Sequence, residues 1–232
     1  EGATQGFGPL RTVLLKGRQW AALADVLDAE ALLCIDDLER AAVTYRAGQI
    51  FESELNDNHS AMSRYLQAFR LNPGEITYLE AGERLYRVEE NWDMVDNLLA
   101  RRLSLVSTKQ EALGIRVEQG KIQHAHLGEP LAAYDTYRAA LRELPESAAE
   151  LVYPALADLV NDIWAFSALE EGVRLRVVNA DTPRVAARGL QELAFLYLEF
   201  HHDVDRGLEI LREAADASPN DHTIFERVTQ QF

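Results

Sequence analysis

The amino-acid sequence predicts an all-α protein, a superhelical solenoid of stacked antiparallel helical hairpins. The first observation is composition. The 232 residues include only seven prolines, and long stretches lack glycine, which favours helices over a sheet protein that needs frequent turn residues. The second is a long repeat that spaces the three tryptophans evenly along the chain. The third is a pattern of small and large side chains that recurs three times before a proline.

The recurring pattern emerges when three segments are aligned on their final prolines, Pro73, Pro145 and Pro219. A small residue stands twelve positions before each proline, a large residue eight before it, and an alanine five before it. In chain order these residues are Ala61, Tyr65 and Ala68, then Ala133, Tyr137 and Ala140, then Gly207, Leu211 and Ala214. The spacing places each set on one face of a helix, which the proline then ends.

The tryptophans define the long period of the repeat, because the interval from Trp20 to Trp92 returns unchanged from Trp92 to Trp164. Pro73 and Pro145 are separated by the same interval. Pro219 follows Pro145 after an interval that is longer by two positions, so we place two extra residues in the last block near 201–203. A helical hairpin of this kind takes about half of such a period. Each period therefore predicts two hairpins, and the regular spacing favours a packing role for the tryptophans over a role in binding.

Start and stop signals divide the chain into helices in order. Pro154 is the misfit, because it lies within an otherwise helical stretch and predicts a kink or a late helix start. Residues 1–8 are expected to be a disordered or expression-derived leader, and 9–232 a single repeat array excerpted from a longer one. The expected helices are 10–16, 18–33, 37–55, 58–71, 75–89, 92–106, 109–127, 130–144, 147–163, 165–179, 183–201, 203–217 and 221–231.

The aligned segments resemble the second helix of the tetratricopeptide repeat, with its small residue, large residue, small residue and proline. The middle copy matches best, through the Leu127-Gly128 turn, Ala133, Tyr137 and Pro145. Alternating hairpins of unequal character are similar to those of long tetratricopeptide arrays in bacterial proteins. The resemblance implies a groove, lined by the first helix of each hairpin, that takes an extended peptide or a partner helix.

Counting back from the prolines gives the inward positions that this resemblance implies. The candidate partner-binding residues are Arg46, Ile50, Glu54, Glu80, Arg84, Arg87, Glu118, Ile122 and His126. Leu156 and Val160 hold such positions in the next hairpin, and Glu192, Leu196 and Glu199 are further candidates in the last one. Arg84 and Arg87 are three residues apart and are expected to meet one acidic segment together. A mixed charged and aliphatic groove suits a peptide or protein better than a small polar metabolite. Chaperone-binding members use a lysine, asparagine and arginine clamp, which Ile50, Glu80, Glu118 and Ile122 do not reproduce.

The net charge of −15 is spread over the whole length. Nucleic-acid binding draws most of its affinity from a basic surface, so this composition argues against a nucleic-acid partner and permits a basic one. No stretch approaches the roughly 18 uncharged apolar residues that a membrane-spanning helix requires. We therefore expect no membrane insertion and leave the compartment open between cytoplasm and periplasm.

No pattern in the sequence predicts catalysis, a cofactor or a metal. Gly6 and Gly8 lack the strand and lysine of a phosphate-binding loop. His124 and His126 are two residues apart, whereas metal-binding pairs on a helix are three or four apart. The abundant carboxylates are expected to be solvated, and Cys34 lies in an apolar run that predicts a buried core residue.

The function that best fits this pattern is a scaffold or adaptor module of a larger assembly, bacterial in style, binding a peptide or protein rather than acting as an enzyme. One alternative is a regulatory or substrate-recruiting region of a larger enzyme. Another is an architectural spacer that associates with itself. Fold alone does not choose among these roles.

Overall fold

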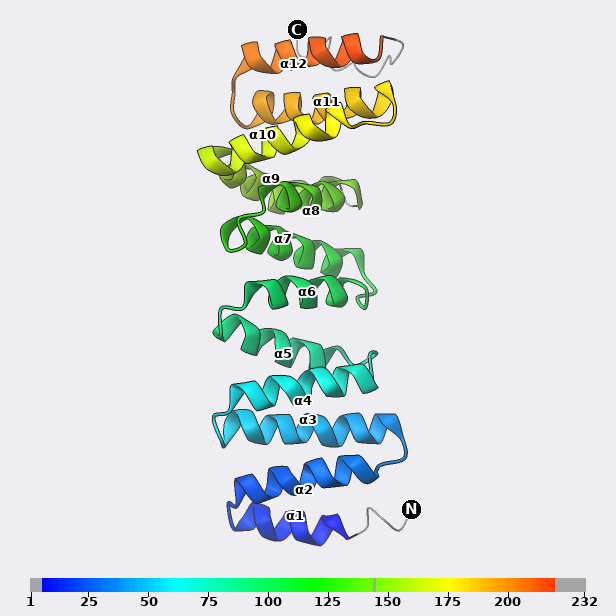
Figure 1. Ribbon diagram of the computed structural model, residues 1–232, viewed down its shortest axis with the longest axis vertical. Helices are drawn as coiled ribbons and strands as arrows, with labels where there is room; N and C mark the ends of the chain where they lie inside the picture. The colour runs from blue at the N-terminus through cyan, green and yellow to red at the C-terminus, as the bar shows by residue number, and fades with distance from the viewer. Residues whose placement is uncertain (1–5, 144, 220–232) are drawn as a thin grey trace. The chain divides into compact units, whose positions relative to one another are not determined.

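The computed structural model describes residues 6–143 and 145–219, except for the side chains of 145–149. This part of the chain contains twelve α-helices and no strand (Figure 1). They are α1 (Phe7–Lys16), α2 (Trp20–Leu33), α3 (Asp37–Ser53), α4 (Asn58–Leu71), α5 (Ile76–Val88), α6 (Trp92–Leu103), α7 (Lys109–Ala125), α8 (Pro130–Glu143), α9 (Pro145–Asn161), α10 (Ile163–Val178), α11 (Pro183–Glu199) and α12 (Val204–Ala217). The all-α prediction is confirmed, and the helix predicted over 221–231 lies outside the described residues.

The chain forms two compact units, Glu1–Val106 and Ser107–Phe232. In the first unit, which contains α1 to α6, each helix packs on the next one within the unit, from α1 on α2 to α5 on α6 (Figure 1). In the second, α7 to α12 do the same, and in addition α7 contacts α9 and α8 contacts α10. Each unit is therefore a solenoid-like arrangement of adjacent helices. The continuity of a single array over 9–232 stays a prediction.

The turns between helices show that the repeat in the sequence is a repeat in the backbone. The turns that precede α4, α8 and α12 each contain one residue of positive φ: Asn56 (50°), Gly128 (65°) and His202 (54°). In each turn the next amide bonds to a carbonyl six residues earlier: Asp57 N to Phe51 O at 2.8 Å, Glu129 N to Gln123 O at 2.7 Å, and Asp203 N to Tyr197 O at 3.0 Å. The intervals between these turns equal the intervals between the three prolines.

One detail of the sequence prediction is wrong. The extra residues of the last block are not near 201–203, because the turn there matches the other two. They lie earlier, where α10 has 16 residues and α6 has 12. Of the two outcomes predicted at Pro154, the late helix start does not occur, because α9 begins at Pro145 and continues through Pro154, and the kink stays a prediction. α1 begins at Phe7, so residues 7 and 8 are helical; residues 1–5 lie outside the described part, and the leader stays a prediction.

The pattern of small and large residues forms the contact within the hairpins. Tyr65 is 2 % exposed, and Tyr137 is fully buried. Each tyrosine lies against a glycine of the preceding helix: a Cβ added at Gly48 would come within 2.7 Å of Cε1 of Tyr65, and one added at Gly120 within 2.7 Å of Cζ of Tyr137. No side chain fits into such a space, so only glycine lets these helices approach this closely.

The packing role predicted for the tryptophans holds only in part. Trp20 is half-buried and packs against the cluster of Leu14, Leu23 and Leu27. Trp92 is half-buried as well. Trp164, by contrast, is 63 % exposed, so its packing prediction is wrong. The prediction for Cys34 is confirmed, because this residue is 2 % exposed in the core of the first unit.

Gly120→Ala should lower the free energy of unfolding by about 1–3 kcal/mol, because the new methyl group must displace the buried ring of Tyr137. Gly114→Ala is the matched control on α7, where an added Cβ has no heavy atom within 4 Å. It should raise stability by about 0.5–1 kcal/mol, through helix propensity alone. Urea unfolding followed by circular dichroism measures both changes. Equal effects of the two substitutions would contradict the close-approach explanation.

Candidate functional site

The predicted partner-binding residues of the first unit lie at different depths. Arg46, Glu54, Glu80 and Arg84 are exposed, whereas Ile50 is half-buried and packs against the apolar cluster below it. In the second unit, Glu118 is half-buried and His126 is exposed at the end of α7. Ile122 is 4 % exposed and belongs to the core. It can support such a face but offers almost no surface to a partner.

Arg84 and Arg87 each have a carboxylate partner within the protein, and the two partners differ. Nη1 of Arg84 lies 2.6 Å from Glu52 of α3. Nη2 of Arg87 lies 2.9 Å from Glu83, which is also 3.3 Å from Arg102 of α6. A partner segment that bound both arginines would have to compete with these ion pairs. Joint binding of one acidic segment by the two arginines therefore stays a prediction that the geometry does not favour.

Glu52 connects three helices of the first unit. Besides its ion pair with Arg84 of α5, it accepts a 2.7 Å hydrogen bond from the hydroxyl of Tyr65 on α4. The hydrogen bond from Arg84 lowers the pKa of Glu52 more than any other stabilising contact, and the bond from Tyr65 lowers it further. The carboxylate thus holds α3, α4 and α5 together while it is charged.

The second unit contains a cavity of about 890 Å³, formed by α8, α9 and α11. Its walls carry four arginines, three aromatic side chains and one carboxylate. We call it the arginine groove and define it by Tyr134, Arg138, Arg142, Tyr153, Arg184, Arg188, Glu192 and Phe195.

Helical spacing explains how these side chains reach one groove. On α11, Arg184, Arg188 and Glu192 follow one another at intervals of four residues and so share a face. The helix is positioned by Pro183 in its first turn and by Thr182, whose hydroxyl accepts from the amide of Val185 at 3.3 Å. Tyr134, Arg138 and Arg142 have the same spacing on α8. Tyr153 comes from α9 and is 44 % exposed.

Glu192 is the carboxylate at the centre of the arginine groove. It accepts a hydrogen bond from Nη2 of Arg138, and Nη2 of Arg142 lies 3.6 Å from the same oxygen. Burial raises the pKa of Glu192, while Arg138, Arg142 and Arg188 act in the opposite direction. The guanidinium of Arg138 also lies 5.4 Å from the centre of the Tyr134 ring, within cation–π range.

A smaller cavity of about 160 Å³ shares Arg138, Val185, Arg188 and Glu192 with the groove and adds Arg176 of α10. Asp135 pairs with Arg176 through a 2.8 Å hydrogen bond and lies 3.7 Å from Arg138. The region therefore gathers five arginines around two carboxylates, Asp135 and Glu192. A chain with a net charge of −15 has a positively charged patch here.

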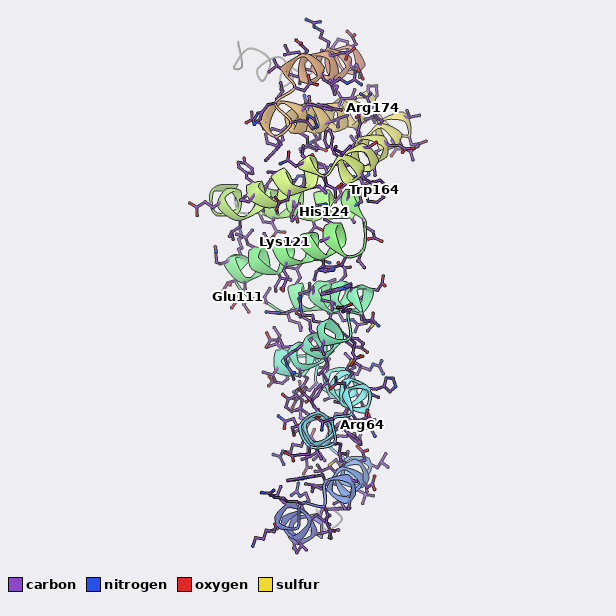
Figure 2. All side chains as sticks on the ribbon, turned by 90° about the vertical axis from the view of Figure 1, so that its left-hand side faces the viewer. Arg64, Glu111, Lys121, His124, Trp164 and Arg174 are labelled. Carbon is purple, nitrogen blue, oxygen red and sulfur yellow. The ribbon has the colours of Figure 1, made fainter. Side chains whose placement is uncertain are left out.

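Another group of side chains lies where the end of α7 comes close to the start of α10 (Figure 2). The ring of Trp164 approaches Gly128, where an added Cβ would lie 3.7 Å from it. Nε2 of His124 lies 3.3 Å from Asp162, which caps α10 by accepting a 3.0 Å hydrogen bond from the amide of Ala165. That backbone bond, followed by the one from His124, lowers the pKa of Asp162. His124 thus fixes the start of α10.

Three further searches, for metal-ligating clusters, for membrane-spanning helices and for known relatives, gave no indication of another site. Within the described residues, no three histidine, cysteine, aspartate or glutamate side chains are grouped closely enough to hold a metal ion. None of the helices described is both long and apolar enough to cross a membrane. No model of a known protein family matches the chain, and the search of curated proteins found no match.

Sequence reasoning found only Glu192 among the residues that define the arginine groove. A signal for three of the others was present in the repeat register. Arg184, Arg188 and Tyr153 occupy positions that hold Gln110, Gly114 and Ala81 in the preceding copy. A residue that departs from its own repeat is not required by the shared packing.

Removing Glu52 should make the first unit less sensitive to acid. Because the folded-state pKa of Glu52 is lowered, its stabilising effect is complete above the unfolded pKa of about 4.5 and is lost as pH falls through the lower folded value. The difference in melting temperature between the wild type and Glu52→Gln should therefore shrink between about pH 6 and pH 3. Thermal unfolding followed by circular dichroism tests this, and a difference independent of pH would contradict it.

Proposed function

We propose that the chain is a tetratricopeptide-type protein-binding module that acts as a scaffold or adaptor in a larger assembly. The arginine groove is its partner-binding site. The observation that carries this proposal is that Tyr153, Arg184 and Arg188, which depart from the preceding copy of the repeat, line one surface cavity. The repeated residues account for the packing of the helices. Residues that differ from the repeat are therefore available for a role other than packing, such as binding.

The dimensions and lining of the groove support a peptide or protein partner. A cavity of about 890 Å³ lies within the usual range of roughly 300–1,000 Å³ for binding pockets. Arginine and tyrosine dominate the lining, and these residues are enriched at the centres of protein interfaces. Glu192 occupies the same register as Arg46 and Glu118, which the tetratricopeptide resemblance assigns to the inward face. The same groove would also serve the alternative role of recruiting a substrate protein to an enzyme.

Site-specific photocrosslinking tests this function. A photoreactive amino acid in place of Tyr153, inside the groove, should crosslink a partner protein in cells of the source organism. The matched control is Ile163, which is 86 % exposed on α10 and does not line the groove. The crosslink at position 153 should disappear in the double variant Arg142→Glu and Arg188→Glu. A crosslink of equal yield at both positions, or none at 153, would refute the groove as the binding site.

The self-associating alternative has an observation of its own in the first unit. Four large apolar side chains around the turn between α2 and α3 are exposed: Leu32 (82 %), Leu33 (49 %), Ile35 (89 %) and Leu38 (58 %). Such a cluster on a folded protein marks a contact surface. It makes association between two copies the second candidate function.

Light scattering over a range of concentrations tests self-association. If this cluster mediates it, the apparent mass should rise with concentration for the wild type and stay at 26.1 kDa for the double variant Leu32→Ser and Ile35→Ser. A dissociation constant of about 1 mM corresponds to an association free energy of about −4 kcal/mol. A wild type that remains monomeric up to that concentration therefore excludes self-association as the function.

A further inference from the structure

The distribution of charge in the arginine groove points to the kind of partner segment that it binds. Arg142 has 60 % of its side chain exposed, and its contact with Glu192 is long, at 3.6 Å. Arg188 is exposed, and no carboxylate of the described residues forms an ion pair with it. Two guanidinium groups therefore face the cavity with weak internal neutralisation. A carboxylate from outside can satisfy both, because guanidinium groups bind carboxylates through paired hydrogen bonds.

Glu192 occupies the place where such a carboxylate would sit. Its side chain is 20 % exposed and reaches Arg138 and Arg142 from α11, across the groove. Burial penalises its charge, so the pairing with Arg138 and Arg142 has to offset a desolvation cost. A ligand carboxylate would compete with Glu192 for Arg138 and Arg142. Because burial already penalises the charged form of Glu192, this competition favours the ligand.

The apolar part of the groove favours a peptide over a bare polyanion. Leu141, Tyr153 and Phe195 line the same cavity as the arginines. These side chains offer contact area to leucine or phenylalanine side chains of a peptide, whereas a phosphate chain gains nothing from them. The net charge of −15 also repels long polyanions such as nucleic acids, whose affinity depends on an extended basic surface.

We propose that the arginine groove binds an acidic peptide segment of a partner protein, and that Glu192 competes with the carboxylates of this segment for Arg138 and Arg142. This inference rests on the proposed function and specifies its ligand. The segment carries glutamate or aspartate side chains toward Arg142 and Arg188 and an apolar side chain toward Tyr153 and Phe195. Glu192 thus limits the affinity of the groove.

Fluorescence anisotropy with a defined probe tests the inference. The probe is a fluorescein-labelled peptide of six glutamates that also contains one leucine and one phenylalanine. The comparison peptide has glutamine in place of every glutamate. The wild type should bind the acidic peptide at least about tenfold more tightly than the comparison peptide, because hydrogen bonds between charged groups are stronger than those to a neutral amide.

Two variants should move the affinity in opposite directions. Arg142→Glu with Arg188→Glu should weaken binding at least about tenfold, whereas Glu192→Gln should strengthen it about threefold to tenfold by removing the competing charge. Arg212→Glu is a charge-reversal control in the same unit, because Arg212 is exposed on α12 and does not line the groove; it should change the affinity by less than about twofold. Circular dichroism of each variant shows that the fold is retained.

Several outcomes would overturn the inference: equal binding of the acidic and glutamine peptides, an unchanged affinity in the folded arginine double variant, or weaker binding by Glu192→Gln. Tighter binding of an oligothymidylate of equal charge would assign the groove to nucleic acid instead. If the photocrosslink at position 153 persists while the acidic peptide fails to bind, the acidic specificity is wrong and the protein-binding function stands. If both fail, both proposals are wrong.

Discussion

The close approach of paired helices at a glycine is the constraint on which each unit depends. Tyr65 and Tyr137 bury their rings against Gly48 and Gly120, and any side chain at either glycine would overlap the ring. Because the ring fills the space that a glycine leaves, the α3–α4 and α7–α8 hairpins bring their helices together at a fixed distance. A single hairpin of this length cannot bury its apolar face alone. Neighbouring helices then stack on it, with alanines such as Ala68 and Ala140 at the contact.

The same packing constraint distinguishes the positions that must recur in every copy from the positions that can vary. The turn with positive φ, the buried tyrosine or leucine and the alanines all recur at the intervals that separate the three prolines. Three residues of the arginine groove, Tyr153, Arg184 and Arg188, do not recur in the preceding copy, although α7, the preceding copy of α11, is otherwise closely comparable. The repeated positions hold the scaffold together. The positions outside the repeat place positive charge on an otherwise acidic chain.

Local sequence signals were sufficient to predict the helices of the described chain. Proline, capping residues and the spacing of small residues all act within a few positions of one another, which is why the helix bounds agree closely with the structure. The two extra residues of the last block had no such signal. They lie where α10 is longer than α6, and no turn residue in the sequence marks that position. The exposure of Trp164 was also missed, since a matching register fixes the position of a residue along the chain and not the neighbours around it.

The candidate site was largely beyond prediction for a related reason. The groove is formed by α8, α9 and α11, and the sequence does not say which non-consecutive helices share a cavity. The register that identified Glu192 placed Ile122 on the same face, although Ile122 is buried in the structure. Arg84 looked available in the sequence because its partner Glu52 lies 32 residues away on another helix. Charge pairing across helices becomes visible only once the hairpins are stacked.

The third copy of the repeat offers the most direct measurement of the packing constraint. At the positions of Gly120 and Tyr137 it carries Ala194 and Leu211, both buried. A double-mutant cycle therefore combines Gly120→Ala with Tyr137→Leu and measures unfolding free energies in urea. We expect Gly120→Ala to be nearly neutral in the Tyr137→Leu background, which gives a coupling energy of about 1–3 kcal/mol. The same cost of Gly120→Ala in both backgrounds would contradict the claim that the fit between glycine and tyrosine sets the helix spacing.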